Sequence, residues 1–427
     1  MKKLSLIVVG VFFSVAAWAA TGEDIDDYPF VDPYEATVLG TPVIYKAKAP
    51  ERVPVETFTL TVFPDREIPE VLWFHDGLKF SLTAQKTEAP LIFNIAGTGA
   101  GYDSTKMKAM QKLLYAAGYH VISLPSPTHP NFVACGSTTQ VPGNMQDDTR
   151  DLYRVMEMAW QTVKDDIEVS EFYLTGYSLG AAQAAFVSFL DETARKFNFK
   201  KVLMINPPVS LYNSVRILDR MLVEYLPEND LRNIDLFFDG LFKVLSEYYQ
   251  TTDYINFNDP DLLYDLYRKE HPTEEGLVTL IGVSFRISSA NMIFTSDVTS
   301  RFGYVVPKKR VLSPYESLSP YFRTTHMISF EDYFHEMFYP YFKAREPGLT
   351  EQALIDRLSL KSIEPYLRKS SKIGLMHNQD DIILAPGEID FFKSVFGDRA
   401  VIYPNGGHCG NMEYKRNVAH MINFFNK

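Results

Sequence analysis

One short segment, residues 176–180 (GYSLG), places a serine between two glycines. An apolar run of strand type precedes it at residues 171–175, and a helix-forming run follows at residues 181–186. In such a strand–turn–helix bend the serine side chain points out of the turn, and the outer glycines lack Cβ atoms that would collide with the neighbouring backbone. Ser178 would then lie at a helix N-terminus, which favours a developing negative charge. We interpret Ser178 as a nucleophile, the alternative being a plain tight turn.

A serine hydroxyl is a weak nucleophile at neutral pH, so a base must activate it and a third group must orient the base. Of the nine histidines, His408 has suitable surroundings, because it lies in a glycine-rich loop at residues 404–410 (PNGGHCG), after a strand-like run at residues 399–403. Glycines on both sides of His408 allow the loop to reach back across the edge of a sheet. The alternative is a turn histidine exposed to solvent.

The candidate acid follows a strand-like run at residues 372–377, where Asp380 and Asp381 are adjacent. A carboxylate at this strand end could accept the Nδ1–H of His408 and stabilise the imidazolium that forms during attack. We expect Asp380 to fill this role, because that register returns Ile382 to the core and leaves Asp381 to hydrogen-bond the turn. Acidic residues at strand ends are also ordinary turn residues.

Serine, acid and histidine in this chain order resemble the α/β-hydrolase superfamily, and the resemblance covers roughly residues 55–210 and 366–427. It implies a mostly parallel eight-stranded sheet with helices on both faces. It also implies that Ser178, Asp380 and His408 form a catalytic triad.

The resemblance further implies an oxyanion hole built from two backbone N–H groups. One belongs to Leu179, the residue after the serine, and the other to the loop after the third strand. Residues 90–95 suit that strand, and residues 96–101 (AGTGAG) form its loop, in which Thr98 is our candidate donor. The family commonly has His-Gly where this chain has Ala-Gly. Nucleotide binding by the glycine run is disfavoured, because no lysine or ribose-binding acid follows at the required spacing.

Several other segments suit the same fold. Early antiparallel strands are expected at residues 53–63 and 71–83, and later strands at residues 119–124 and 201–205. Asn144 is suited to begin a long helix. The strand at residues 201–205 is followed by Asn-Pro-Pro rather than by a carboxylate, which favours an acid after the later strand.

Residues 211–365 lack the strand–turn rhythm of such a sheet and show helical stripes instead. We expect a large, mainly helical lid or cap, inserted before the strand that carries the acid. Aromatic residues occur here in pairs, at residues 237–238, 248–249, 333–334 and 338–339. We expect most of them to pack the core of the lid and some to line a substrate pocket. No metal site is expected, because the pair His335-Glu336 lacks the second histidine of a zincin motif.

The chain starts like a secretory signal peptide, with two lysines, an apolar stretch at residues 4–15 and a small-x-small site ending at Ala19. We therefore expect a periplasmic or secreted protein without an integral membrane segment after cleavage. An uncleaved anchor is disfavoured because the apolar stretch is short. The expected organisation is a signal peptide at 1–19, a hydrolase core at 20–210 and 366–427, and a lid at 211–365.

Composition fits a large soluble enzyme. The chain has 427 residues, 46% of them hydrophobic, and a formal net charge of −11. This charge disfavours nucleic acid and anionic membrane surfaces as partners. Two cysteines, Cys135 and Cys409, could pair in an oxidising compartment and tie the His408 loop down, or they could be two independent buried thiols.

We therefore expect a serine hydrolase that cleaves a carboxylic ester, or a thioester or amide, through an acyl-enzyme, with no metal or organic cofactor. A peptidase or amidase of the same fold is the second hypothesis. A binding protein that has kept a hydrolase scaffold without catalysis is the alternative from another class. The sequence leaves the identity of the small-molecule or acyl-ester substrate and the oligomeric state open.

Overall fold

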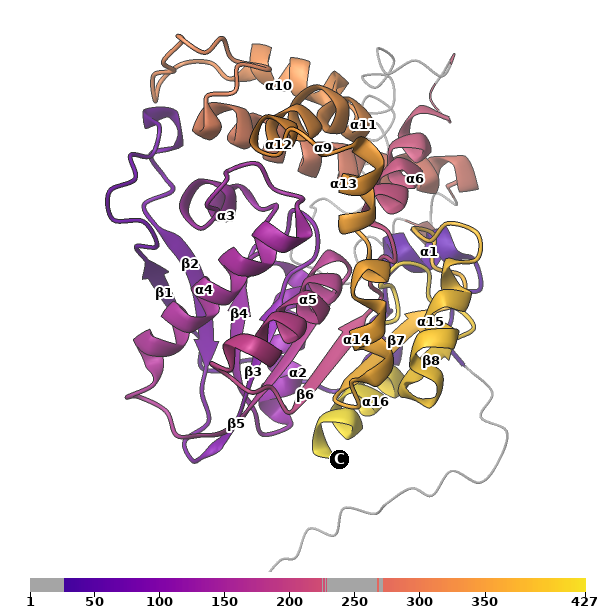
Figure 1. The fold of residues 1–427 in the computed structure, drawn as a ribbon. Coiled ribbons are helices and arrows are strands. Elements are labelled where there is room, and N and C mark those ends of the chain that lie inside the picture. The colour runs from indigo at the N-terminus through magenta and orange to yellow at the C-terminus, as the bar shows by residue number, and fades with distance from the viewer. Residues whose placement is uncertain (1–26, 225, 227, 229–266, 269–271) are drawn as a thin grey trace, which may run out of the picture.

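A computed structural model describes residues 27–224, 226, 228, 267–268 and 272–427 (Figure 1). The predicted signal peptide and the aromatic pairs at residues 237–238 and 248–249 lie outside the described residues.

In the part of the chain that the structure describes, eight strands form one sheet in the order β1-β2-β4-β3-β5-β6-β7-β8. Only β2 runs antiparallel to its neighbours, and the pairs from β4 to β8 are parallel. This arrangement confirms the predicted mostly parallel eight-stranded sheet. The strands are β1 Glu56–Leu60, β2 Leu78–Thr83, β3 Ala89–Ile95, β4 His120–Leu124, β5 Val169–Tyr177, β6 Lys201–Ile205, β7 Ile373–Asn378 and β8 Ala400–Tyr403.

Helices cover both faces of the sheet, as predicted, because alternate residues of the inner strands are buried on opposite sides. In β3, Leu91 and Phe93 pack in one cluster with helices α4 and α5, whereas Ile92 packs in another with α2 and α16. These four helices are α2 Thr105–Ala116, α4 Met145–Val163, α5 Leu179–Ala194 and α16 Lys415–Asn426. Asn144 caps α4, as its position predicts, by accepting the N–H of Gln146.

The predicted strand at residues 71–83 is shorter in the structure. Its first part forms the 3-10 helix η2 (Glu70–Leu72), and β2 begins only at Leu78. Val71 and Leu72 are buried against Phe294 instead of in the sheet. Contacts with a helix distant in the sequence therefore overrode the strand-like pattern.

A layer of helices lies over one end of the sheet (Figure 1). It contains α6 Leu211–Val223, α9 Glu274–Ser300, α10 Ser319–Met327, α11 Phe330–Tyr333, the π-helix η5 Phe334–Phe338, α12 Tyr339–Arg345 and α13 Glu351–Arg357. The remaining helices are α1 Pro33–Leu39, η1 Val43–Tyr45, α3 Pro130–Cys135, η6 Leu360–Ile363, α14 Glu364–Lys369, α15 Glu388–Phe396 and η7 Gly397–Arg399.

Helix α9 is the centre of this layer. Its length and composition would allow it to cross a membrane, but 61% of its most apolar stretch is buried inside the protein, as is typical of a core helix. Its buried Arg286 donates to Asp219 of α6 at 2.9 Å and to the carbonyl of His326 at 3.0 Å. The paired charge thus connects three helices of the layer.

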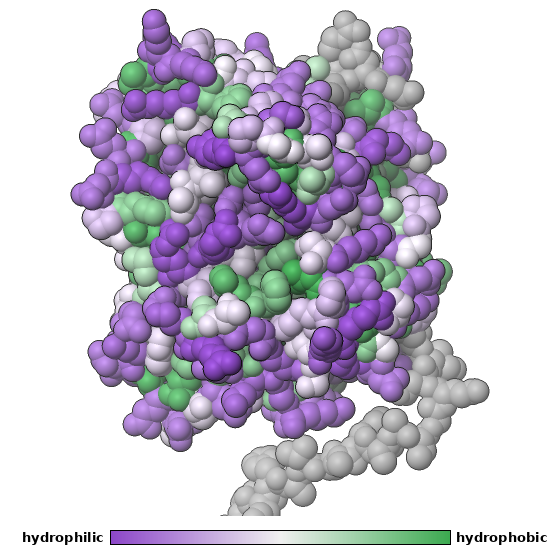
Figure 2. Space-filling model, in the orientation of Figure 1, coloured by the Kyte–Doolittle hydropathy of each residue, from purple (hydrophilic) through white to green (hydrophobic). Residues whose placement is uncertain are grey.

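The face of the molecule in Figure 2 is mostly hydrophilic, with apolar residues gathered in a band at mid-height.

Candidate active site

The serine predicted as nucleophile lies at the junction of β5 and α5. Ser178 has φ 54° and ψ −127°, an unusual conformation for a residue with a side chain. A Cβ atom on Gly176 would collide with the carbonyl oxygen of Gly180, and one on Gly180 would collide with that of Ile95. Both glycines are therefore required for the bend, which lifts the serine out of the sheet at the start of a helix.

His408 reaches this serine from the loop after β8. Its Nε2 is 2.9 Å from Ser178 Oγ, and its side chain is 17% exposed, so the pair is accessible at the surface of the site. Gly406 and Gly407 have positive φ angles of 147° and 51°. The glycine-rich loop thus adopts a path that other residues rarely follow.

The acid that meets His408 is Asp381. Its Oδ1 and Oδ2 are 3.0 and 3.1 Å from His408 Nδ1, and its side chain is fully buried. Asn206 donates to Oδ2 at 2.9 Å, from the turn after β6. Burial raises the pKa of Asp381, but His408 and the hydrogen bonds lower it more, so the net pKa lies below the usual value. Asp381 therefore remains a carboxylate.

The prediction that Asp380 is the partner of His408 was wrong by one residue. Asp380 instead accepts the N–H groups of Gly406 and Gly407, both at 3.0 Å. The cause is the strand end: β7 extends to Asn378, one residue beyond the predicted run. Residues 379–380 then form a turn, in which the N–H of Asp381 donates to the carbonyl of Asn378 at 3.3 Å, and this turn directs Asp381 rather than Asp380 toward His408. It also buries Ile383 rather than Ile382 in the core.

Burial alone would lower the pKa of His408, but the Asp381 carboxylate raises it above the usual imidazole value. An imidazole that takes the proton of a serine becomes an imidazolium, and a neighbouring carboxylate stabilises that positive charge.

Serine, acid and histidine follow strands β5, β7 and β8 and meet in one hydrogen-bonded series at the end of a sheet in which β2 alone is antiparallel. The chain has an α/β-hydrolase fold. The sheet, the bend and the chain order that the resemblance implied are all present.

No protein-family model matches this sequence, and no curated protein matches it. Solved α/β-hydrolase structures are similar in fold at low identity. An acylaminoacyl peptidase of Pyrococcus horikoshii is 12% identical over 90% of this chain and 42% of that chain, with a TM-score of 0.42. An esterase of Pyrococcus furiosus is 11% identical over 88% of this chain and 91% of that chain, with a TM-score of 0.41. A fungal esterase from Rhizomucor miehei is 12% identical over 89% of this chain and 84% of that chain, also with a TM-score of 0.41. This chain spans less than half of the peptidase's length.

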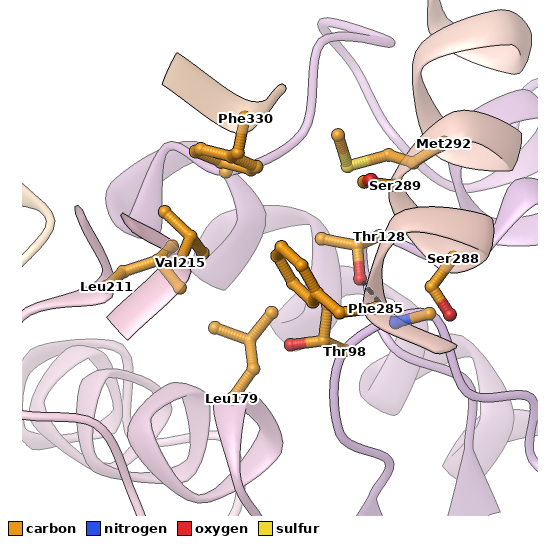
Figure 3. Close-up of a pocket in the computed structure, with 12 residues that line it drawn as sticks. Thr98, Thr128, Leu179, Leu211, Val215, Phe285, Ser288, Ser289, Met292 and Phe330 are labelled. Carbon is orange, nitrogen blue, oxygen red and sulfur yellow. Dashed lines mark hydrogen bonds between the residues drawn. The ribbon is translucent and has the colours of Figure 1, made fainter. Parts of the chain in front are cut away.

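The loop after β3 passes directly over the serine of this hydrolase fold. A Cβ on Gly97 would lie 2.6 Å from the Tyr177 ring and 3.2 Å from Ser178 Cβ, so only glycine allows the approach. The next residue, Thr98, lines a cavity together with Leu179 (Figure 3). The first N–H groups of a helix have no acceptor within the helix, so the N–H of Leu179 is available to a ligand. The oxyanion hole formed by the N–H groups of Leu179 and Thr98 stays a prediction.

Two residues that the sequence analysis overlooked fix this loop. Thr128 Oγ1 accepts the N–H of Gly99 at 2.8 Å and is 2.9 Å from Ser126 Oγ (Figure 3). Both belong to the turn after β4, where the sequence analysis predicted only the end of a strand. Asn206, which binds the acid, was likewise noted only because it is not a carboxylate.

The cavity beside Leu179 lies between the sheet and the helical layer. Its volume is about 20 Å³, room for about one water molecule. Figure 3 shows the ring of Phe285, from α9, pointing toward Leu179 and Thr98, with Phe330 on the opposite side. Most of the wall is apolar: Leu179, Leu211, Val215, Phe285, Met292 and Phe330. Seven of the twelve residues that line this cavity belong to the described part of residues 211–365.

The two cysteines are not bonded to each other, so of the two predicted options the structure has the separate buried thiols. Cys135 packs in the cluster on the α4 and α5 face, and Cys409 in the cluster on the α2 and α16 face. The sheet separates them, which excludes a disulfide without rearrangement.

Proposed function

We propose that this chain is a serine hydrolase that cleaves a carboxylic ester, or a thioester or amide, through an acyl-enzyme. One observation carries the proposal: Ser178, His408 and Asp381 form an unbroken hydrogen-bonded series at 2.9 and 3.0 Å. The strained bend that presents the serine supports it, because strain at one residue persists only where the surrounding structure maintains it.

The geometry supports a two-step acyl transfer. His408 Nε2 takes the proton of Ser178 as Oγ attacks the substrate carbonyl carbon, and Asp381 holds the Nδ1–H of the resulting imidazolium. The N–H groups of Leu179 and Thr98 are the proposed donors to the oxyanion. His408 then protonates the leaving group, and water releases the acyl group by the same steps in reverse order.

The cavity wall favours an apolar acyl group over a charged one, because its side chains are mainly aliphatic and aromatic. Carboxylic ester hydrolysis is the leading subclass because α/β-hydrolase folds serve it most often, and a peptidase or amidase is second. The complete series of Ser178, His408 and Asp381 disfavours a non-catalytic binding protein, since binding alone does not require a histidine hydrogen-bonded to a serine hydroxyl.

The test is reaction of the purified protein with a fluorophosphonate probe, followed by a panel of p-nitrophenyl esters of graded acyl length. Covalent labelling at Ser178 together with turnover of at least one ester supports the proposal. A folded protein that resists labelling and hydrolyses none of the esters, thioesters or amides offered contradicts it.

We also propose that residues 211–365 act as a lid and that Phe285 limits acyl-chain length. Replacing Phe285 by alanine enlarges a cavity that now holds about one water molecule. We expect relative kcat/KM to shift toward longer acyl chains by about 10–200-fold per methylene-scale mismatch. The measurement is kcat/KM across the ester series.

Phe334→Ala is the matched control. Phe334 belongs to the same layer but is fully buried in the core, as is its neighbour Tyr333, so it does not line the cavity. This variant should lose about 3–5 kcal/mol of unfolding free energy while keeping the parental ranking of esters. If the ranking is the same in Phe285→Ala as in the parent, the layer is not a specificity lid.

Export is part of the same proposal. Cleavage after Ala19 would deliver the enzyme to the periplasm or the medium. N-terminal sequencing of the protein from fractionated cells tests this, and an intact Lys2-Lys3 start on the mature protein would contradict it.

A further inference from the structure

The first segment of the chain that the structure describes lies against the loop that carries His408. This segment, residues 28–47, contains α1 and η1 and is called the N-terminal strap below. Figure 1 shows α1 near the yellow C-terminal part of the chain. Thr41 Oγ1 donates to the carbonyl of Gly410 at 2.9 Å. The N–H of Ala47 donates to the carbonyl of Glu413, also at 2.9 Å. The strap is thus bound to the loop at several points.

The backbones of α1 and the loop touch directly. A Cβ atom on Gly407 would collide with the carbonyl oxygen of Pro33, and one on Gly410 would collide with that of Ala36. Glycines at these two loop positions are therefore explained by the presence of α1 as well as by the path of the loop. The contact is specific, because it leaves no room for any side chain at either position.

One side chain of the strap bonds the backbone of the histidine itself. The N–H of His408 donates to Thr37 Oγ1 at 2.8 Å, and the Thr37 hydroxyl donates to the carbonyl of Pro33 at 2.6 Å. Because the Thr37 hydroxyl proton is bonded within α1, the orientation of the hydroxyl is fixed, and its oxygen is left to accept the N–H of His408. Since Asp380 accepts the N–H groups of Gly406 and Gly407, three successive N–H groups of the loop have fixed acceptors.

We propose that Thr37 is a positioning residue that holds His408 on Ser178, and this inference rests on the proposed hydrolase function. Thr37 contacts the backbone of His408 and not the reacting atoms, so it acts through the histidine. The loop needs such an anchor because Gly407 and Cys409, on either side of His408, both have positive φ angles of 51° and 62°. Without an acceptor for its N–H, the residue between them is free to relax away from Ser178.

The expected kinetic signature follows from this role. Ser178 and His408 must be aligned in the transition state, whereas Thr37 does not line the cavity that we propose to receive the acyl group. Loss of the anchor should therefore lower kcat and leave KM nearly unchanged. A misplacement of about 1 Å can cost on the order of 10²-fold in rate.

The experiment compares Thr37→Val with Thr37→Ser in the full chain. Valine keeps the shape and removes the acceptor, and we expect kcat to fall by about 10–100-fold with KM nearly unchanged. Serine keeps the hydroxyl and should restore most of the loss. Because Thr37 is only partly buried, both variants are expected to fold.

Tyr28→Phe is the matched control in the same strap. The Tyr28 hydroxyl donates to the carbonyl of Gly40 at 2.8 Å, inside the strap, so its removal weakens the strap without touching His408. It should lower thermal stability without the fall in kcat.

The inference is overturned if valine and serine at position 37 give the same kcat, or if Tyr28→Phe loses as much activity as Thr37→Val. Failure of the hydrolase proposal is distinguishable, because the parent protein itself would then not react with a fluorophosphonate. If the parent reacts, its labelling rate provides a second measure of His408 alignment in each variant, independent of the substrate chosen.

Discussion

Replacing Ser178 by alanine is expected to lower turnover by about 10⁴–10⁶-fold and to abolish labelling by a fluorophosphonate. The reason is that attack on the carbonyl carbon needs the Oγ that lies 2.9 Å from His408 Nε2. Binding of substrate should persist, since the cavity wall remains. The measurements are ester hydrolysis, mass spectrometry of the labelled protein and a thermal melt.

Ser188→Ala is the control for this variant. Ser188 is fully buried on the same helix and is 2.7 Å from the hydroxyl of Tyr366, so its loss affects packing but not the reacting atoms. Cys409 Sγ is 3.8 Å from His408 Nε2, so Cys409→Ala is combined with Ser178→Ala to remove a second nucleophile near the base. Ordinary hydrolysis by the double variant would end the serine-hydrolase proposal.

The second large effect is expected at Asp381. Asp381→Asn should lower turnover by about 10⁴-fold, because an amide can donate to His408 Nδ1 and favour the wrong tautomer. Asp380→Asn should cost much less, since this residue bonds the N–H groups of Gly406 and Gly407 and not the imidazole. The measurement is kcat for both variants on one ester. A larger loss at Asp380 would restore the order predicted from the sequence and contradict the geometry.

The pH profile of the same pair gives an independent test. The base must be neutral, so kcat/KM falls as the pH drops through the pKa of His408. Asp381 raises that pKa, so Asp381→Asn should move the acid limb of the profile to lower pH. Asp380→Asn should move the limb less. A limb that stays in place in Asp381→Asn would indicate that the carboxylate does not interact with the base in solution.

Much of the catalytic geometry could be read from the sequence because it depends on local backbone requirements. The bend at Ser178 needs glycines at positions 176 and 180, and the His408 loop needs residues that tolerate positive φ. Buried parallel strands are continuous apolar runs, so the inner strands were also predictable, whereas their order in the sheet comes from the structure.

The choice between Asp380 and Asp381 was not a local matter. β7 extends to Asn378, which pairs with Tyr403 in β8, and residues 379–380 then form a turn. That turn brings Asp381 to His408, and where it begins depends on how far β7 pairs with β8. Val71 and Leu72 illustrate the same point, because a strand-like pattern yielded to contacts with α9.

The sequence by itself thus determined a serine in a strained bend, a glycine-flanked histidine and a parallel sheet to bring them together, since each follows from short-range sterics and periodicity. Tertiary structure alone decided which aspartate meets His408, that Asn206 binds that aspartate, that Phe285 lines the cavity and that Thr37 accepts the His408 N–H. Thr37 and His408 are 371 residues apart, and contacts across such separations depend on how the elements pack and leave no pattern in the residues near either partner.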